Sequence, residues 1–265
     1  PRYTMRILFR IFIMLALHVP GQAIAQHTDP VDSVGSLSSK QWHEHDRFPW
    51  KGLIVPAAMT GYGFAAVHSA SLQQLNRDIR QHIWTDNPHD ALRLDDYFRF
   101  VPMAAVYGLN LAGVKGRNDL RDRTLLLALS TVIMGGTTFT LKHVIQEPSL
   151  HNSDSLANGY FPSGHTATAF MAAEFMWQEY HDRSPWYGLA GYAFAAATGY
   201  FRMYNDHHWF SDVVAGAGIG IGSTKLAYWI YPRIKRALFN DRKMNALVMP
   251  YYRANTFGLD MVTRF

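Results

Sequence analysis

One pair of side chains in this chain has a spacing suited to chemistry. His208 and Asp212 lie four residues apart in the segment FRMYNDHHWFSD. On a helix, residues four apart share a face, so the carboxylate can accept a hydrogen bond from the imidazole and fix its tautomer. The other ring nitrogen of His208 is then expected to point into a cavity. His207 has no carboxylate four residues further on, and we interpret it as an ordinary polar residue at the membrane interface.

A second histidine follows a turn in GYFPSGHTATAF. The Pro162-Ser163-Gly164 turn leads into an apolar segment that is typical of a helix, with His165 in its first turn. The free N–H groups and the dipole at a helix N-terminus favour an anion. Ser163 could cap this helix or donate to that anion, and Gly164 permits close approach of the backbone.

Two cations complete the set. Arg202 offers a planar fork of donors suited to phosphate oxygens, and Lys142 adds a point charge. Lys142 and Arg202 end predicted helices, whereas His165 and the pair of His208 with Asp212 open others. In an antiparallel bundle these helix ends meet at one membrane face. Ionisable groups gathered there are costly, so they predict a functional site.

The elements that position these groups are predicted membrane helices. Apolar residues make up 48% of the 265 residues, and the charged residues cluster between apolar stretches that contain few charges. These stretches have about the length needed to cross a bilayer, roughly 17–25 residues. The sequence therefore predicts an all-α fold, a polytopic membrane bundle of about six transmembrane helices. The predicted helices cover residues 52–70, 97–114, 124–141, 163–180, 185–201 and 211–231.

Other segments have a distinct composition. Residues 72–96 are polar and amphipathic, which predicts a helix at the membrane interface. Small residues in AGYAFAAATGY and VVAGAGIGIGS predict close contact between helix backbones. The tail from Met244 alternates apolar and polar residues around a turn signal at Ala254-Asn255, so it could form a short hairpin.

The chain divides into four expected parts. Its opening carries arginines, an apolar run and then Ala23-Ile24-Ala25, which is typical of a signal cleavage site, although an uncleaved anchor helix is the alternative. The parts are a signal peptide or N-terminal anchor (1–25), a polar segment (26–50), a membrane domain (51–231) and a basic C-terminal tail (232–265).

Composition also argues against several kinds of site and partner. The chain has no cysteine, which excludes a disulfide framework and a thiolate metal site. Its 13 histidines are mostly scattered, so no metal and no cofactor is expected. The net charge of +5 is modest and belongs to membrane-flanking loops, so nucleic acid is not an expected partner.

Together, the two segments resemble a known family. Phe161-Pro162-Ser163-Gly164-His165, followed by Arg202-x5-His208-x3-Asp212, is similar to the second and third motifs of the type 2 phosphatidic acid phosphatase (PAP2) superfamily. The resemblance covers roughly residues 95–231 and implies a PAP2/haloperoxidase-like core. The runs SGHTATAFMAAEF, RMYNDHHW and GAGIGIGSTKLAYWIYP are similar to membrane-bound members from Bacteroidetes-type bacteria, some of them lipid A phosphatases.

The resemblance implies a metal-independent lipid phosphatase. His208 would attack phosphorus and form a phosphohistidine, Asp212 would orient it, and His165 would protonate the leaving alcohol. The substrate would be a lipid phosphate or pyrophosphate, such as lipid A, phosphatidic acid, phosphatidylglycerol phosphate or undecaprenyl pyrophosphate. Charge on the phosphoryl oxygens would be stabilised by Arg202, Lys142 and the amides of Ser163 and Gly164.

One motif departs from the family pattern. The family's first motif is a lysine, six residues, then Arg-Pro, whereas here Lys142 is followed by HVIQ and Glu147-Pro148. We expect Glu147 to face away from the phosphate, and His151 could compensate in part for the missing arginine. This departure keeps open a catalytically impaired PAP2-like protein that binds lipid or assists envelope assembly. A vanadium haloperoxidase-like enzyme is a further alternative.

Two signals disagree about which side of the membrane the site faces. The connections at 115–123 and 232–243 are strongly basic, which places them in the cytoplasm and the site in the periplasm. A cleaved signal peptide followed by six full spans would instead turn the site inward. Because two loops agree, we expect a protein of the bacterial inner membrane whose site faces the periplasm, in contact with membrane lipids.

Overall fold

The computed structural model describes residue 48 and residues 50–148, 150, 156–238, 246–253 and 256–263. The predicted signal peptide or anchor, most of the polar segment 26–50, and His151 lie outside the described residues. The helices are α3 (Trp50–His68), α4 (Ala70–Arg80), the π-helix η1 (Gln81–Thr85), α5 (Asp95–Phe98), α6 (Val101–Leu111), α7 (Leu120–Val144), α8 (Gly164–Tyr180), α9 (Pro185–Tyr204) and α10 (Phe210–Leu238). The strands are β1 (Gln146–Pro148), β2 (Leu156–Asn158), β3 (Ala246–Arg253) and β4 (Thr256–Thr263).

All six predicted helices are present, and the second is shorter than expected. Instead of one helix over 97–114, the chain forms the single turn of α5 and then the 11 residues of α6. Pro102 lies at the start of α6, where its missing N–H needs no partner, so the proline favours a new helix start. At about 1.5 Å per residue, α6 is too short to cross a bilayer.

Helix α7 has two faces with different neighbours. Leu126, Ser130 and Met134 recur every fourth residue and are buried. On other faces of the helix, Val132 and Phe139 are 69% and 67% exposed. Apolar side chains that are not packed in the protein core are stable when they face lipid. We therefore interpret α7 as a membrane helix that packs one side against the bundle.

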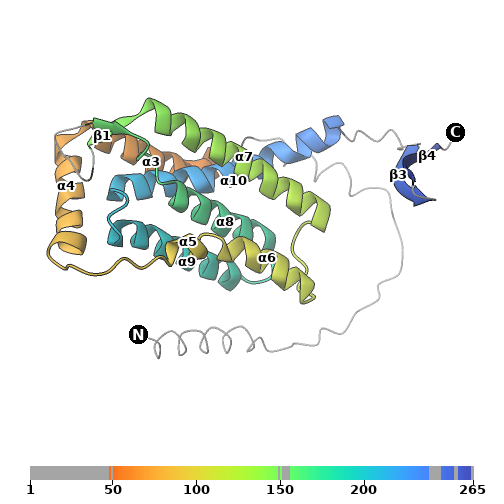
Figure 1. Cartoon of the computed structure of the whole chain (residues 1–265), viewed down its shortest axis with the longest axis horizontal. Helices are drawn as coiled ribbons and strands as arrows, with labels where there is room; N and C mark the ends of the chain where they lie inside the picture. Colours follow the sequence, from red (N-terminus) through yellow and green to blue (C-terminus); the bar gives the residue numbers. More distant parts are fainter. Residues whose placement is uncertain are drawn as a thin grey trace. The chain divides into compact units, whose positions relative to one another are not determined.

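Helix α10 packs against α3, α7 and α8 and forms the centre of the bundle (Figure 1). Its glycines make this possible. A Cβ at Gly216 would lie 2.5 Å from the carbonyl oxygen of Ser163, and one at Gly220 would lie 2.3 Å from that of Ala167. The backbones of α8 and α10 are therefore in direct contact, as the small residues predict.

Helix α4 turns away from α3 by 97°. It lies across the end of the bundle at which β1 also lies (Figure 1). The predicted amphipathic segment 72–96 is thus helical as far as Thr85, with Pro88 soon after, and becomes helical again at Asp95 where α5 begins. Buried Asn76 fixes α4 to α10, because its amide donates to Ser211 Oγ at 2.8 Å and its carbonyl oxygen accepts from Ser211 N at 3.2 Å.

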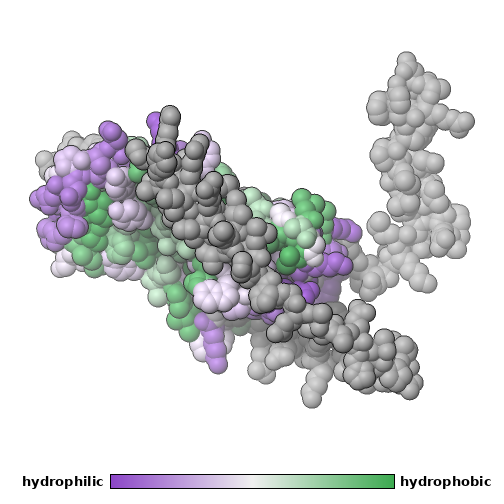
Figure 2. Space-filling view, turned by 90° about the horizontal axis from the view of Figure 1, so that it is seen from below, coloured by the Kyte–Doolittle hydropathy of each residue, from purple (hydrophilic) through white to green (hydrophobic). Residues whose placement is uncertain are grey.

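By length and composition, two helices among the described residues qualify as membrane spans. These are α7 and residues Phe210–Arg236 of α10, and the bent pair of α3 with α4–η1 would be a third. Figure 2 shows patches of hydrophobic residues on the bundle and hydrophilic residues gathered at the end on the left. The described chain is therefore a helical membrane protein.

Charged side chains inside the bundle are paired across helices. Glu174 of α8 accepts from Lys225 of α10 at 2.8 Å and from the hydroxyl of Tyr192 of α9. Near the C-terminal end of α8, buried Arg123 donates to buried Glu179 at 3.1 Å. Burying an unpaired charge in these positions would cost much free energy. The ion pairs therefore favour the arrangement of helices that brings the partners together.

The C-terminal tail contains the predicted hairpin. Strands β3 and β4 pair in antiparallel register, with Arg253 opposite Thr256, so residues 254–255 connect them. Helix α10 continues to Leu238, past the expected end of the last helix at residue 231.

Replacing Gly220 with alanine tests the contact between α8 and α10. The new methyl group would meet backbone atoms of α8 that cannot move aside, so we expect a loss of stability of about 1–3 kcal/mol. Gly222→Ala is the matched control, because its Cβ would meet only Pro56 Cβ at 3.6 Å. Thermal unfolding in detergent measures both variants, and equal melting temperatures would contradict the close packing.

Candidate active site

The two motif segments are joined through their backbones. The N–H of Ser163, just before α8, donates to the carbonyl oxygen of Asp212 in the first turn of α10 at 3.1 Å. Ser163 is fully buried, and its hydroxyl accepts from Thr166 N at 3.4 Å. Of the two roles left open for Ser163, the side chain therefore performs the helix cap. The anion-facing amides at this terminus are then those of Gly164 and His165, in the first turn of α8.

His208 and Asp212 lie together as their spacing predicts. Nδ1 of His208 is 3.3 Å from Oδ2 of Asp212, and the same carboxylate oxygen accepts from Trp209 N at 2.9 Å. Asp212 is fully buried, so its charge is held by these contacts. Burial lowers the pKa of His208, the contacts with Asp212 raise it, and the charges of Arg202 and Lys142 lower it. The net lowering favours a neutral imidazole with Nε2 available.

Arg202 is oriented by a carboxylate that sequence reasoning missed. Its Nη1 donates to Oδ2 of Asp95 at 2.7 Å, and both side chains are largely buried. Its Nε is also buried and has no hydrogen-bond partner among the described residues. A buried donor without a partner is costly unless a ligand accepts from it. The free edge of Arg202 is therefore suited to an anion.

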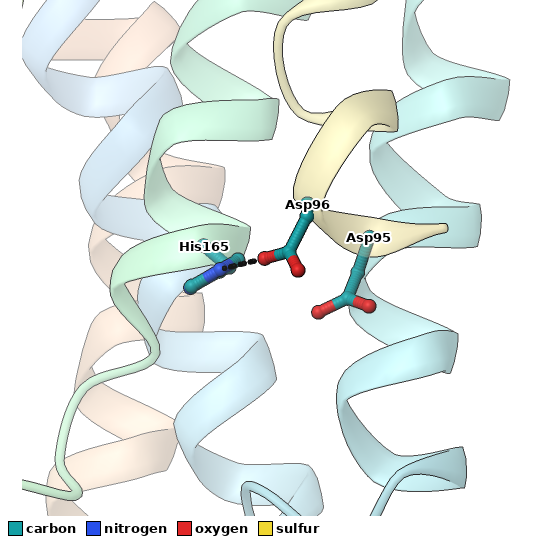
Figure 3. A group of neighbouring side chains, drawn as sticks. All are labelled: Asp95, Asp96 and His165. Carbon is teal, nitrogen blue, oxygen red and sulfur yellow. Dashed lines mark hydrogen bonds and ion pairs between the residues drawn. The ribbon is translucent and has the colours of Figure 1, made fainter. Parts of the chain in front are cut away.

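His165 also has an acidic neighbour. Its Nε2 lies 3.0 Å from Oδ1 of Asp96, and this hydrogen bond lowers the pKa of Asp96 (Figure 3). Figure 3 shows both aspartates on α5, side by side and facing α8. Oxygen and nitrogen atoms of Asp95, Asp96 and His165 lie within 4.8 Å of one another, a spacing that could hold a cation. Because Asp95 already pairs with Arg202 and Asp96 with His165, we assign the aspartates to orienting these two groups.

Lys142 extends from the last turn of α7 along the loop before α8. Its Nζ donates to the carbonyl oxygen of Gly159 at 2.6 Å and to that of Tyr160 at 3.2 Å. Its Cε lies 3.9 Å from the place of a Cβ at Gly164. Lys142 thus borders the turn that precedes His165, and all five ionisable groups predicted to converge lie at one end of the bundle.

The expectation that Glu147 faces away is wrong. Its side chain is buried, with 2% exposed, and it interacts with Asp212 and Lys142. Burial raises the pKa of Glu147, and the neighbouring negative charge of Asp212 raises it further. A neutral carboxyl does not repel a phosphate. Strand pairing explains the direction of the side chain, because the short β1–β2 hairpin fixes Glu147 opposite Ala157.

The sequence contains only a weak indication that Asp95 and Asp96 belong to the site. Two consecutive aspartates immediately before an apolar stretch are unusual, but their partners are more than 60 residues away. Asn205 adds a further link, since its amide donates to Leu92 O at 2.9 Å and to Asp95 Oδ1 at 3.2 Å. No local pattern indicates these contacts.

Similar proteins include a lipid A 1-phosphatase of Porphyromonas gingivalis, which is 39% identical over 171 residues. The match covers 63% of this chain but only 38% of that relative's length. Two crystal structures are also similar. LpxE of Aquifex aeolicus has 23% identity and a TM-score of 0.43, with 58% of this chain and 94% of that chain covered. A PAP2-type phosphatidylglycerolphosphate phosphatase of Bacillus subtilis has 18% identity and a TM-score of 0.37, with 71% and 95% covered.

A family model agrees with the motifs. Residues 123–236 match the model of the PAP2 superfamily, a range that contains Lys142, His165, Arg202, His208 and Asp212. The range begins in α7, includes α8 and α9 and ends in α10, so it contains most of the helix ends that form the site. Residues 123–236 of this chain are therefore similar to the PAP2 superfamily.

Proposed function

We propose that this protein is a membrane phosphatase that removes phosphate from a lipid phosphate or pyrophosphate through a phosphohistidine intermediate. The observation that carries the proposal is the buried His208–Asp212 pair beside an arginine with a free, buried Nε. The candidate lipids are lipid A, phosphatidic acid, phosphatidylglycerol phosphate and undecaprenyl pyrophosphate. Similarity to a lipid A 1-phosphatase favours the first of these.

The proposed reaction has two steps. Asp212 holds Nδ1 of His208, so Nε2 attacks phosphorus in line and the bond to the leaving oxygen breaks. His165 gives its proton to that oxygen from the ring nitrogen that is not bonded to Asp96. Water, deprotonated by His165, then cleaves the P–N bond and releases phosphate. Every proton is carried by a residue of the chain, so the mechanism requires no metal.

Charge stabilisation would come from groups at three helix ends. Arg202 and Lys142 face the site from α9 and α7, and the first amides of α8 add their dipoles. The phosphoryl group carries its charge on the equatorial oxygens in the transition state, which is where a cationic cradle acts. Neutral Glu147, which stands where the family has an arginine, would be a hydrogen-bonding neighbour of Asp212.

We also propose that the site faces the periplasm in the inner membrane. The basic residues Lys115, Arg117 and Arg121 lie at the ends of α6 and α7 remote from the site. Lys235 and Arg236, in the last turns of α10, extend the same charge bias. Positive residues are retained on the cytoplasmic side, which supports this orientation.

Phosphate release from the four lipids by purified protein in detergent tests the proposed function. We expect His208→Ala to lower kcat/KM at least about 1000-fold, because the nucleophile is lost. His207→Ala is the matched control and should keep its activity. A chelator should not change the wild-type rate.

The phosphate-release assay also distinguishes an active phosphatase from a catalytically impaired PAP2-like protein. The missing first-motif arginine, replaced by an acid beside Asp212, is the one observation that favours a lipid-binding or assembly role without catalysis. That role predicts no phosphate release by the wild type and no phenotype for His208→Ala in cells. Such results would overturn the phosphatase proposal.

Replacing Glu147 with glutamine tests its protonation. An unfolded glutamate ionises above about pH 4.3, whereas the raised pKa keeps folded Glu147 protonated. Above that pH the unfolded chain binds fewer protons than the folded chain, so the wild type loses stability as pH rises. Glu147→Gln removes this loss. We expect the melting temperature of Glu147→Gln to exceed that of the wild type by more at pH 8 than at pH 5. Each kcal/mol of difference in the free energy of unfolding corresponds to about 2–4 °C in melting temperature.

Exposed Asp90 provides the control for this experiment. Asp90→Asn should leave the difference between pH 5 and pH 8 as in the wild type. Glu147→Gln should also keep most of the phosphatase activity, since its amide can donate to Asp212 as the protonated acid does. A melting difference that is the same at both pH values would show that Glu147 is ionised in the folded protein.

A further inference from the structure

The histidine that would attack phosphorus lies outside the helices. Helix α9 ends at Tyr204 and α10 begins at Phe210, so His208 belongs to the connection 205–209. Asp212 holds Nδ1 of the imidazole, but the place of the whole ring depends on the backbone that carries it. In-line attack requires close placement of Nε2, since an error of about 1 Å can cost roughly 100-fold in rate. The contacts that fix this connection therefore bear on the reaction.

The connection begins with a turn in an unusual conformation for its sequence. The N–H of Asp206 donates to the carbonyl oxygen of Met203 at 3.0 Å. The N–H of His207 donates to that of Arg202 at 2.9 Å, which completes a Schellman motif at the end of α9. Asp206 takes the left-handed position of this motif, with φ 53°, and among the described residues no other non-glycine residue has a positive φ. Glycine adopts this conformation without steric cost, so a contact outside the turn is needed to explain the aspartate.

That contact is with Arg80 of α4. Nε and Nη2 of Arg80 donate to the two carboxylate oxygens of Asp206, at 2.7 and 2.8 Å. Asp206 is only 8% exposed, so the pair is largely shielded from water. A bidentate pair of this kind fixes orientation as well as distance. A glycine would suit the turn better, but it would leave Arg80 without this partner.

Arg80 also contacts the other side of the histidine. Its guanidinium lies 5.9 Å from the centre of the Trp209 ring, within the range of a cation–π interaction. Trp209 is 7% exposed, and its backbone N–H donates to Oδ2 of Asp212 at 2.9 Å. Arg80 therefore contacts the residue two positions before His208 and the residue directly after it, and the second of these is bonded to the carboxylate that orients the imidazole.

Helix α4 is held in place by other contacts. The amide of Asn76 donates to Ser211 Oγ at 2.8 Å, and its carbonyl oxygen accepts from Ser211 N at 3.2 Å. These bonds fix α4 across the end of the bundle, one turn before Arg80 (Figure 1). Loss of the contact between Arg80 and Asp206 therefore leaves the helix attached, and a substitution there tests the contact rather than the fold.

We propose that Arg80 is a positioning residue for the nucleophile, and that its contacts with Asp206 and Trp209 hold the connection 205–209 so that Nε2 of His208 faces the reacting phosphate. This inference rests on the proposed phosphatase function. It adds to the site a residue of α4, outside the range 123–236 that matches the PAP2 superfamily. Because Arg80 acts through its neighbours, its loss should lower kcat and leave KM nearly unchanged.

Two substitutions remove the contact in different ways. Asp206→Gly keeps the left-handed turn and removes the carboxylate, whereas Arg80→Gln removes the guanidinium and leaves a buried carboxylate unpaired. We expect kcat to fall about tenfold in Asp206→Gly and about 100-fold in Arg80→Gln, with KM within about twofold of the wild type. Phosphate release from the lipid that the wild type hydrolyses fastest measures both constants. If Arg80 only stabilised the turn, Asp206→Gly would keep the wild-type kcat, and that result would overturn the proposal.

Further variants separate positioning from a loss of folding. Arg80→Lys keeps the charge without the bidentate geometry, so it should retain more of kcat than Arg80→Gln. The double variant Arg80→Gln/Asp206→Gly should resemble Asp206→Gly, and additive losses would show that Arg80 does not act through Asp206. Arg77→Gln is the matched control, because Arg77 is an exposed residue of α4 whose printed bonds are to Gln74, and it should keep the wild-type kcat. Thermal unfolding in detergent identifies any variant that is not folded.

A binding measurement tests the positioning of His208 without turnover. Orthovanadate can accept Nε2 as a fifth ligand in the geometry of in-line transfer, whereas inorganic phosphate contacts only the cationic groups. By isothermal titration calorimetry, we expect Asp206→Gly and Arg80→Gln to lower the affinity for vanadate about tenfold and to leave the affinity for phosphate unchanged. Equal losses for both anions, or no loss for either, would overturn the positioning role and leave the phosphatase function standing. If the wild type releases no phosphate and binds both anions equally, both proposals fail.

Discussion

The site depends on the direct contact between the backbones of α8 and α10. The N–H of Ser163 donates to the carbonyl oxygen of Asp212, which places the first turn of one helix against the first turn of the other. This hydrogen bond can form only because Gly216 leaves no side chain between α10 and the same turn. The positions of His165 and His208 follow from it, since His165 lies in the first turn of α8 and His208 lies just before α10. A single hydrogen bond thereby joins two residues that are 49 positions apart in the sequence.

Charge compensation is the second constraint on this end of the bundle. Each ionisable group of the site has a fixed partner: Asp95 for Arg202, Asp96 for His165, and two backbone carbonyl groups for Lys142. These partners hold charged side chains at the edge of an apolar bundle, where an uncompensated charge would be costly. They also leave specific atoms available for a substrate. The buried Nε of Arg202 is the clearest, because it has no partner among the described residues.

The position of α4 connects the membrane fold with the site. Its 97° bend from α3 carries a polar helix across the end of the bundle, where Asn76 and Arg80 bind the segment around His208. An interfacial helix was expected here from its amphipathic pattern. The hydrogen bonds to Ser211 and Asp206 could not be expected, because nothing in the local sequence of α4 specifies a partner that is about 130 residues away.

The sequence alone determined the features that depend on local spacing. His208 and Asp212 lie together, as their spacing of four residues predicts, although His208 precedes α10 and is not part of the helix. Ser163 begins a helix because its side chain caps the following turn. The six helices follow from apolar stretches, although α6 is shorter than expected because Pro102 starts it anew. Only the tertiary structure decided the direction of Glu147 and the roles of Asp95 and Asp96. Those depend on a short β-hairpin and on contacts between distant helices, whose geometry is set by packing of the whole bundle and leaves no periodic signal in the chain.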